Sequence, residues 1–148
     1  GDMYVADISQ ATVLAIFLLP ENMNKLVNNF LAMKPGSRIV SNTFAATGWD
    51  ADESGRSDGE CGSWCNWLLY IVPAKAEGRW RFQKGELELE QKFQMLSGKF
   101  TLNGVSTPVD SGRLLGEQIT FTIGGKEYQG KVSGDAMSGS GWNATRLK

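Results

Sequence analysis

The two cysteines of the sequence are the side chains with the most direct chemistry. Cys61 and Cys65 lie four residues apart in a Gly-containing stretch. Two thiols at this spacing are close enough to form a disulfide in an oxidising compartment, but a structural zinc site needs four ligands. The sequence has no His that could complete such a set. We therefore predict no metal site. The two cysteines could be free thiols or form a loose disulfide, and the sequence favours neither.

Carboxylates form two further groups. The loop 50–60 contains the first group, Asp50, Asp52, Glu53, Asp58 and Glu60. Oxygen ligands in a flexible loop suit calcium, but this loop lacks the regular spacing and terminal Glu of a helix-loop-helix calcium site, so we interpret it as solvated. The second group is Glu86, Glu88 and Glu90. Their alternate spacing is typical of the exposed face of a strand, so we assign them no catalytic role.

The composition excludes several classes of function. Without His the chain lacks the commonest general base and any Ser-His-Asp triad, so catalysis would depend on carboxylates, Lys, Tyr or a cofactor. The 148 residues carry 15 Lys and Arg against 16 Asp and Glu. Because phosphate neutralisation needs a surplus of cations, we expect no nucleic-acid partner. The longest apolar run, residues 11–19, is too short to span a bilayer, so we expect no membrane partner. The sequence does not distinguish a cytoplasmic from a periplasmic location.

The first half of the chain has the pattern of a strand, a helix and a strand. Residues 12–19 are a continuous apolar run, typical of a strand buried on both faces of a parallel sheet. Pro20 ends this run and begins a helix with apolar residues at spacings of three and four. Residues 38–44 form the next strand, so this half predicts one parallel β-α-β crossover. A long loop, 45–66, and an apolar strand, 67–72, follow.

The second half predicts short antiparallel strands. Leu87, Leu89, Phe93 and Met95 alternate with polar residues, which predicts one half-buried strand. Tight hairpin turns are indicated at Asn103-Gly104, Gly124-Gly125 and Ser133-Gly134-Asp135. These signals predict a meander of about seven or eight strands that closes as a small barrel or a sandwich. The length allows one or two domains, and we place the domains at 1–75 and 76–148.

Four stretches of the first 44 residues carry a family resemblance. They are Gly1-Asp2-Met3-Tyr4, Phe17-Leu18-Leu19-Pro20, the helix that follows, and Lys34-Pro35-Gly36-Ser37-Arg38-Ile39-Val40-Ser41. In this order they resemble the second half of a class I S-adenosylmethionine-dependent methyltransferase domain, around its fourth and fifth strands. The resemblance implies an α+β fold whose first part is an incomplete, Rossmann-like β-α-β segment. It also implies that 67–75 closes the same sheet and that Gly78 begins a β domain appended in some bacterial members.

The resemblance implies where a cofactor would lie. Asp2 would contact the adenine of S-adenosylmethionine, and Leu19, Pro20 and Asn22 would line the methyl-transfer pocket. The family also uses a Gly-rich loop after its first strand and an acidic residue at the end of its second, and this chain has neither. We therefore expect that the cofactor of the intact family is not bound by this chain alone, and we name no catalytic residue.

A second resemblance concerns the β half. Gly78-Arg79-Trp80 and the late Arg146 are similar to the Gly-x-Trp and Arg pair of lipocalin-like barrels, in which the Arg packs over the Trp. It implies an alternative function as a small-ligand-binding or oligomerisation module. The pocket of that alternative would be lined by Trp80, Phe93, Phe100, Phe121, Tyr128 and Trp142. A segment of about 70 residues is short for a ligand-holding barrel, so we favour an interior filled by side chains.

The leading hypothesis is a C-terminal fragment of a methyltransferase-like protein with an incomplete cofactor site, inactive by itself. The strand 12–19 would then have an apolar edge and an uncovered sheet face. We predict that a second copy of the chain, or the missing N-terminal half, covers this surface. A purely structural module is a third possibility.

Overall fold

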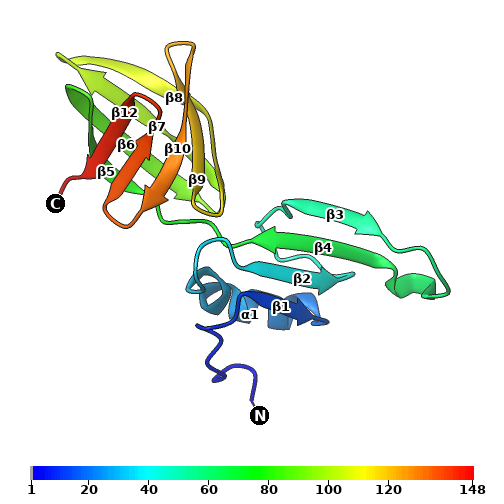
Figure 1. The fold of residues 1–148 in the computed structure, drawn as a ribbon. Coiled ribbons are helices and arrows are strands. Elements are labelled where there is room, and N and C mark those ends of the chain that lie inside the picture. Colours follow the sequence, from blue (N-terminus) through cyan, green and yellow to red (C-terminus); the bar gives the residue numbers. More distant parts are fainter. Residues whose placement is uncertain (1) are drawn as a thin grey trace. The chain divides into compact units, whose positions relative to one another are not determined.

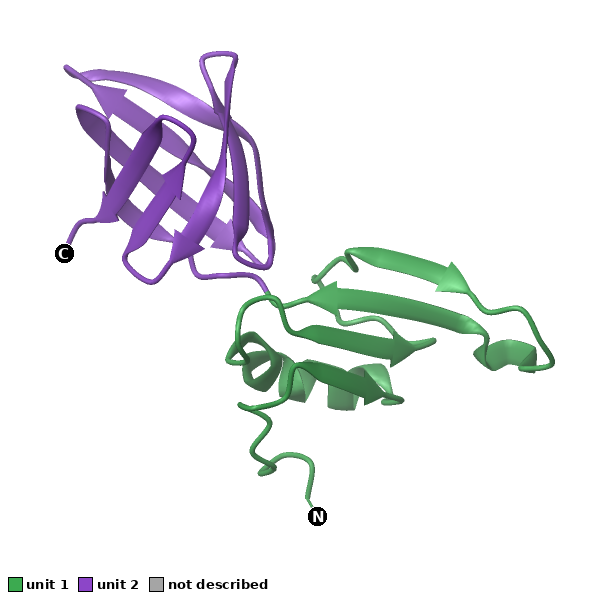
Figure 2. Ribbon diagram, in the orientation of Figure 1, with its two compact units in different colours: residues 1–72 green, residues 73–148 purple. Residues whose placement is uncertain are grey.

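The computed structural model describes residues 2–148, which form two compact units divided between Val72 and Pro73 (Figures 1 and 2). This division lies three residues before the boundary that we placed between 75 and 76. We refer to the part before it as unit 1 and to the part after it as unit 2. Within the described residues, no helix has the length and apolar character needed to cross a bilayer.

Unit 1 is a small mixed sheet with one α-helix. Its elements are β1 (Val13–Ile16), α1 (Pro20–Leu31), β2 (Arg38–Asn42), β3 (Glu53–Arg56), the 3-10 helix η1 (Gly62–Trp64) and β4 (Asn66–Ile71). The strand order is β1-β2-β4-β3. β1 and β2 are parallel, as the β-α-β pattern predicts, and β4 is antiparallel to β2 and β3. The strand after the long loop therefore lies in the same sheet, as the resemblance implied.

The helix α1 covers one face of this sheet. It begins at Pro20 with Leu19 as its N-cap, and it buries Met23, Leu26 and Phe30. The register places Ile39 beside Tyr70 on one face, and both are buried. Figure 1 shows α1 along this single side of β1 and β2. Since unit 1 has one α-helix among its described residues, the other face has no helix of its own.

Two expectations for unit 1 need correction. The strand predicted at 12–19 is only Val13–Ile16, and it is not buried on both faces, because β1 is an edge strand whose Val13 is 57% exposed. The residues after Ile16 leave the sheet because Pro20 must begin α1. The stretch 45–66 is not all loop, since it contains β3 and η1. β3 pairs with β4, a contact that spacing alone does not indicate.

Unit 2 is a closed antiparallel barrel of eight strands, and so it is not a sandwich. The strands are β5 (Gly78–Phe82), β6 (Gly85–Lys92), β7 (Met95–Leu102), β8 (Val105–Leu115), β9 (Gln118–Ile123), β10 (Lys126–Ser133), β11 (Ala136–Gly139) and β12 (Trp142–Arg146). Each strand pairs with its neighbour in the chain, and β12 pairs with β5 to close the ring (Figure 1). The predicted turns at 103–104 and 124–125 join β7 to β8 and β9 to β10.

The barrel interior is filled by apolar side chains. Inward-pointing residues alternate along the strands, as Trp80 and Phe82 on β5 and Leu87 and Leu89 on β6 illustrate, and the alternation shifts at the irregularity within β8. All four of these side chains are 1% exposed or less. Burial of this kind is worth roughly 1.5–3 kcal/mol for a large apolar side chain, so the interior is the main source of the stability of unit 2.

The prediction of one strand that continues through Phe93 and Met95 is wrong, because β6 ends at Lys92. Lys92 pairs with Met95, so Phe93 and Gln94 form the two-residue turn between β6 and β7. Phe93 has φ 53°, in the left-handed region, and Met95 is exposed while Gln94 is buried. The alternation of polar and apolar residues continues across this turn, and periodicity therefore cannot locate it.

Two glycines give Trp142 its place against the barrel. Gly130 on β10 pairs with Gly139 on β11. A Cβ on Gly130 would lie 2.4 Å from Cζ2 of Trp142, and one on Gly139 would lie 2.2 Å from its Nε1. The indole ring therefore occupies space that any larger residue would need, and its Nε1 donates a hydrogen bond to the carbonyl oxygen of Gln129 at 3.0 Å.

Candidate functional site

The residues that the methyltransferase resemblance indicated lie near the carboxyl ends of β1 and β2. Ligands of open α/β sheets bind beyond the carboxyl ends of parallel strands, and β1 and β2 are the parallel pair of this chain. Leu19 is the N-cap of α1, Pro20 is its first residue, and Asn22 lies in its first turn. Leu19 is 61% exposed, so this end of the helix is open to solvent.

Asp2 reaches the same place through Tyr4. The Tyr4 backbone N–H donates a hydrogen bond to Oδ1 of Asp2 at 2.9 Å, and the Tyr4 hydroxyl donates one to Oδ1 of Asn22 at 2.7 Å. The structure therefore links two of the four predicted cofactor residues, although they are twenty positions apart in the sequence. Tyr4 belongs to the stretch that carried the resemblance, but its type alone gave no reason to assign it a role.

The charges beside this site are paired. Nζ of Lys25 lies 2.8 Å from Oε1 of Glu21, one helical turn earlier in α1. This hydrogen bond lowers the pKa of Glu21, and the same contact raises the pKa of Lys25. Both groups are exposed, so the pair adds little stability. It leaves no unpaired titrating group on the first turn of α1 that could act as an acid or a base.

The start of α1 offers few backbone donors to a ligand. The connection from β1 to α1, residues 17–19, contains no Gly, and Pro20 has no N–H to offer a ligand at the start of the helix. One carboxylate oxygen of Asp2 already accepts the Tyr4 N–H.

The aromatic residues of the alternative ligand pocket lie mostly in the barrel core. Trp80, Phe100, Phe121 and Trp142 are buried there, and Tyr128 is partly buried against them. The ring of Phe82 lies 5.1 to 5.8 Å, centroid to centroid, from those of Phe100, Phe121, Tyr128 and Trp142. Phe93 lies in the β6–β7 turn and is not among the residues of this cluster. The rings therefore pack on one another inside the barrel.

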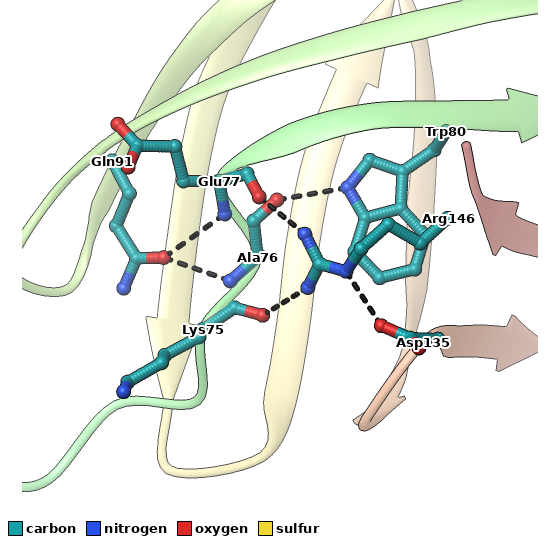
Figure 3. A network of polar contacts seen from close by, with 7 residues as sticks. All are labelled: Lys75, Ala76, Glu77, Trp80, Gln91, Asp135 and Arg146. Carbon is teal, nitrogen blue, oxygen red and sulfur yellow. Dashed lines mark hydrogen bonds and ion pairs between the residues drawn. The ribbon is translucent and has the colours of Figure 1, made fainter. Parts of the chain in front are cut away.

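Arg146 closes one end of the barrel over Trp80 (Figure 3). Its guanidinium carbon lies 4.2 Å from the centroid of the Trp80 ring, the arrangement that the Gly-x-Trp and Arg pair predicts. Arg146 donates hydrogen bonds to the carbonyl oxygens of Lys75, at 2.9 Å, and Glu77. The Trp80 Nε1 donates one to the carbonyl oxygen of Ala76 at 2.9 Å. These contacts hold residues 75–77 against the barrel, and they involve no group arranged for catalysis.

The cysteines form a disulfide. Cys61 and Cys65 are bonded across η1, with their Cα atoms 5.2 Å apart. Within residues 2–148, no three His, Cys, Asp or Glu side chains gather in a way that could hold a metal ion. The bond encloses Trp64, which sequence reasoning left unassigned because a lone Trp in a polar loop has no periodic pattern.

The known proteins that resemble this chain match part of its length. No family model matches the chain. A protein-lysine N-methyltransferase of Saccharolobus islandicus (strain REY15A) is 42% identical over 55 residues, which cover 36% of this chain and 34% of that protein. Part of this chain is related to methyltransferases. The chain thus spans about a third of the length of the curated relative that it matches.

A solved structure also belongs to a methyltransferase. It is the crystal structure of an RNA methyltransferase from Salinibacter ruber in complex with S-adenosyl-L-homocysteine, with 32% sequence identity. The matched region covers 51% of this chain and 46% of the Salinibacter ruber chain, with a TM-score of 0.44. The sequence relationship over 55 residues is what ties this chain to methyltransferases.

Proposed function

We propose that this chain is the C-terminal part of a methyltransferase-like protein, and that its unit 1 supplies one wall of an S-adenosylmethionine site. The parallel β1–β2 pair, the single helix between them and the sequence relationship support this assignment. The wall consists of Asp2, Leu19, Pro20 and Asn22, linked in part through Tyr4. The chain by itself transfers no methyl group, because these residues do not form a complete cradle for the cofactor.

The edge and one face of the sheet in unit 1 are open, and this observation supports the proposal. β1 is an edge strand, and no strand within residues 2–148 pairs with the N–H and C=O groups along its outer side. The face opposite α1 presents apolar residues that are exposed or only half-buried, among them Val13, Val40 and Leu69. A Rossmann-like sheet is covered on both faces, so we propose that this surface receives the strands and helices that carry the missing Gly-rich loop.

The partner is either a second copy of this chain or a separate N-terminal half. A second copy would bury the β1 edge but would bring no Gly-rich loop, because the sequence has none after a strand at the start of a helix. The N-terminal half would supply both. The barrel interior is occupied by its own side chains, which argues against a ligand held inside the barrel.

The test measures S-adenosylmethionine binding by calorimetry, and light scattering determines the oligomeric state of the same sample. We expect no binding by this chain at millimolar cofactor. We also expect binding once an N-terminal methyltransferase half is supplied, and a Val13→Lys change on β1 should prevent that rescue. Micromolar binding by the chain alone would contradict the incomplete site, and the light scattering would then show whether a dimer creates it.

A further inference from the structure

The disulfide of unit 1 closes a short loop at the surface. Three residues separate Cys61 from Cys65, and they form η1, which contains no buried residue. The entropy that such a bond removes from the unfolded chain grows with the length of the loop, so this bond stabilises the fold less than one between distant segments would. Its main effect is therefore local, on the position of η1.

The two cysteines differ in their access to solvent. Cys65 is 3% exposed, whereas Cys61 is partly exposed and is followed by Gly62 and Ser63, which are both exposed. Reduction begins when a thiolate attacks one sulfur of the bond, and access decides which sulfur it reaches. Accessible disulfides are the labile and regulatory ones, so the exposure of Cys61 makes this bond open to reduction in the folded chain.

Hydrogen bonds join η1 to the ends of β2 and β3. Nδ2 of Asn42 donates one to the carbonyl oxygen of Trp64 at 2.8 Å, and the N–H of Ser57 donates one to the carbonyl oxygen of Cys65 at 2.9 Å. Within η1, the Trp64 N–H donates to the carbonyl oxygen of Cys61 at 3.0 Å. A helix of three residues is unstable by itself, because a first turn fixes several backbone dihedrals for one hydrogen bond. The position of η1 therefore depends on the covalent bond between its flanking cysteines.

Trp64 of η1 lies at the edge of the sheet where ligands of open α/β sheets bind. Phe17 directly follows β1 and Phe44 comes two residues after β2, at the carboxyl ends of the two parallel strands. The ring centroid of Trp64 lies 5.3 Å from that of Phe17 and 6.1 Å from that of Phe44. The position of η1 therefore decides how far the indole covers this edge.

A strained residue couples η1 to the end of β2. Thr43 directly follows β2 and has φ 66°, in the left-handed region that a β-branched residue rarely adopts. Its N–H donates a hydrogen bond to the carbonyl oxygen of Asn66, at the start of β4, at 2.8 Å. Its hydroxyl donates one to Oδ1 of Asn42, the residue whose Nδ2 donates to Trp64. Strain of this kind persists only where the surroundings maintain it, so the conformation of Thr43 depends on η1.

We propose that the Cys61–Cys65 disulfide is a redox switch for the carboxyl edge of β1 and β2. While the bond is intact, η1 keeps Trp64 against Phe17 and Phe44, and the indole covers part of this edge. Reduction frees η1, Trp64 leaves the two phenyl rings, and the edge opens. That this edge binds a ligand rests on the proposed function, whereas the movement of η1 does not.

An external dithiol is the reductant that this step requires. One of its thiolates attacks Sγ of Cys61 and forms a mixed disulfide, while the bond to Cys65 breaks and that sulfur leaves as a thiolate. The second thiol of the reductant then loses its proton and attacks the reductant's first sulfur, which closes a cyclic disulfide and releases Cys61. Both cysteine thiolates take up a proton, so electrons and protons pass in equal number from the dithiol to the protein.

Hydrogen exchange in this chain, without any cofactor, tests the switch. Amide exchange is measured before and after treatment with dithiothreitol, and mass spectrometry after alkylation counts the free thiols. The reporters are the hydrogen-bonded amides of Trp64 and Thr43. The reference is the Leu114 amide in the barrel, which donates a hydrogen bond to the carbonyl oxygen of Gln94 at 2.7 Å.

We expect dithiothreitol to reduce the bond in the folded chain and to accelerate exchange at Trp64 and Thr43 about thirtyfold, the factor that the chain-entropy view gives for a bond closing five residues. Leu114 should keep its rate. The double variant Cys61→Ser, Cys65→Ser should exchange like the reduced chain and should not respond to dithiothreitol. A bond that resists reduction, unchanged exchange at Trp64 and Thr43 in the reduced chain, or an equal acceleration at Leu114 would overturn the proposal.

A second measurement reports whether the edge opens. A soluble gadolinium chelate speeds the relaxation of protons that solvent reaches, and it needs no ligand. The ring protons of Phe17 and Phe44 should relax faster in the reduced chain, and those of Phe82, buried in the barrel, should not change. Unchanged relaxation of Phe17 and Phe44 would show that Trp64 keeps its place and would contradict the switch. Because no cofactor is present in either measurement, these outcomes are independent of whether the chain binds S-adenosylmethionine.

Discussion

The guanidinium carbon of Arg146 lies 4.2 Å from the centroid of the Trp80 ring, at the seam where β12 pairs with β5 and closes the barrel. The register places these two residues directly opposite each other, near the last and first strands of unit 2. Arg146 is also within hydrogen-bond distance of the carbonyl oxygen of Lys75, so it joins the chain entering the barrel to the chain leaving it. A single side chain therefore stabilises the closure of the whole ring.

Replacing Arg146 should open this seam. Arg146→Ala removes a cation–π contact and hydrogen bonds from a charged donor to two carbonyl groups, so we expect a loss of about 2 kcal/mol in the stability of unit 2. Asp135 also pairs with Arg146, but its side chain is 78% exposed, so Asp135→Ala should cost much less. Amide hydrogen exchange of β5 and β12 reports unit 2 separately from unit 1. Similar protection losses in both variants would show that the ion pair, and not the stacking, stabilises the seam.

Breaking the disulfide should release Trp64 and the segment before it. In the chain-entropy view, a bond closing five residues contributes about 2 kcal/mol. The N–H of Ser57 donates a hydrogen bond to the carbonyl oxygen of Cys65 at 2.9 Å, so loosening Cys65 also loosens the end of β3. We expect trypsin to cleave after Arg56 faster in the double variant Cys61→Ser, Cys65→Ser. Cleavage within the barrel serves as the internal reference, and an unchanged rate after Arg56 would contradict this role.

Tyr70 should make the stability of unit 1 depend on pH in the alkaline range. Burial raises the pKa of Tyr70 above its ordinary value of 10.0; the hydrogen bond from the Ala46 N–H opposes this rise, and the charge of Asp50 adds to it. The unfolded chain therefore loses this proton at a lower pH than the folded chain. The free energy of unfolding should be unaffected by Tyr70 below the ordinary pKa and should fall as the pH rises through and above 10.

Urea unfolding at pH 8 and at pH 11 tests this linkage. The loss of stability between the two values should be smaller in Tyr70→Phe, although that variant also loses the acceptor for the Ala46 N–H and is less stable at pH 8. An equal loss in the wild-type chain and in Tyr70→Phe would exclude Tyr70 as its source.

Local sequence patterns predicted much of the architecture. The helix at Pro20, the parallel pair around it and the hairpin at Asn103-Gly104 all depend on spacings of a few residues, which determine propensity and turn type directly. The turn at Phe93 escaped prediction because its residues continue the alternation of the strands beside it. β3 escaped because its four residues pair with β4 and have little apolar character of their own.

The sequence by itself determined the class of each half, the absence of His chemistry and the chain segments that resemble a methyltransferase. Only the tertiary structure decided that the barrel closes, that Tyr4 joins Asp2 to Asn22, and that Trp64 meets Phe17 and Phe44. The physical reason is the range of the interactions. Periodicity and turn chemistry act between neighbours in the chain, whereas a ring of strands or a cluster of side chains forms only when distant segments bury surface against each other.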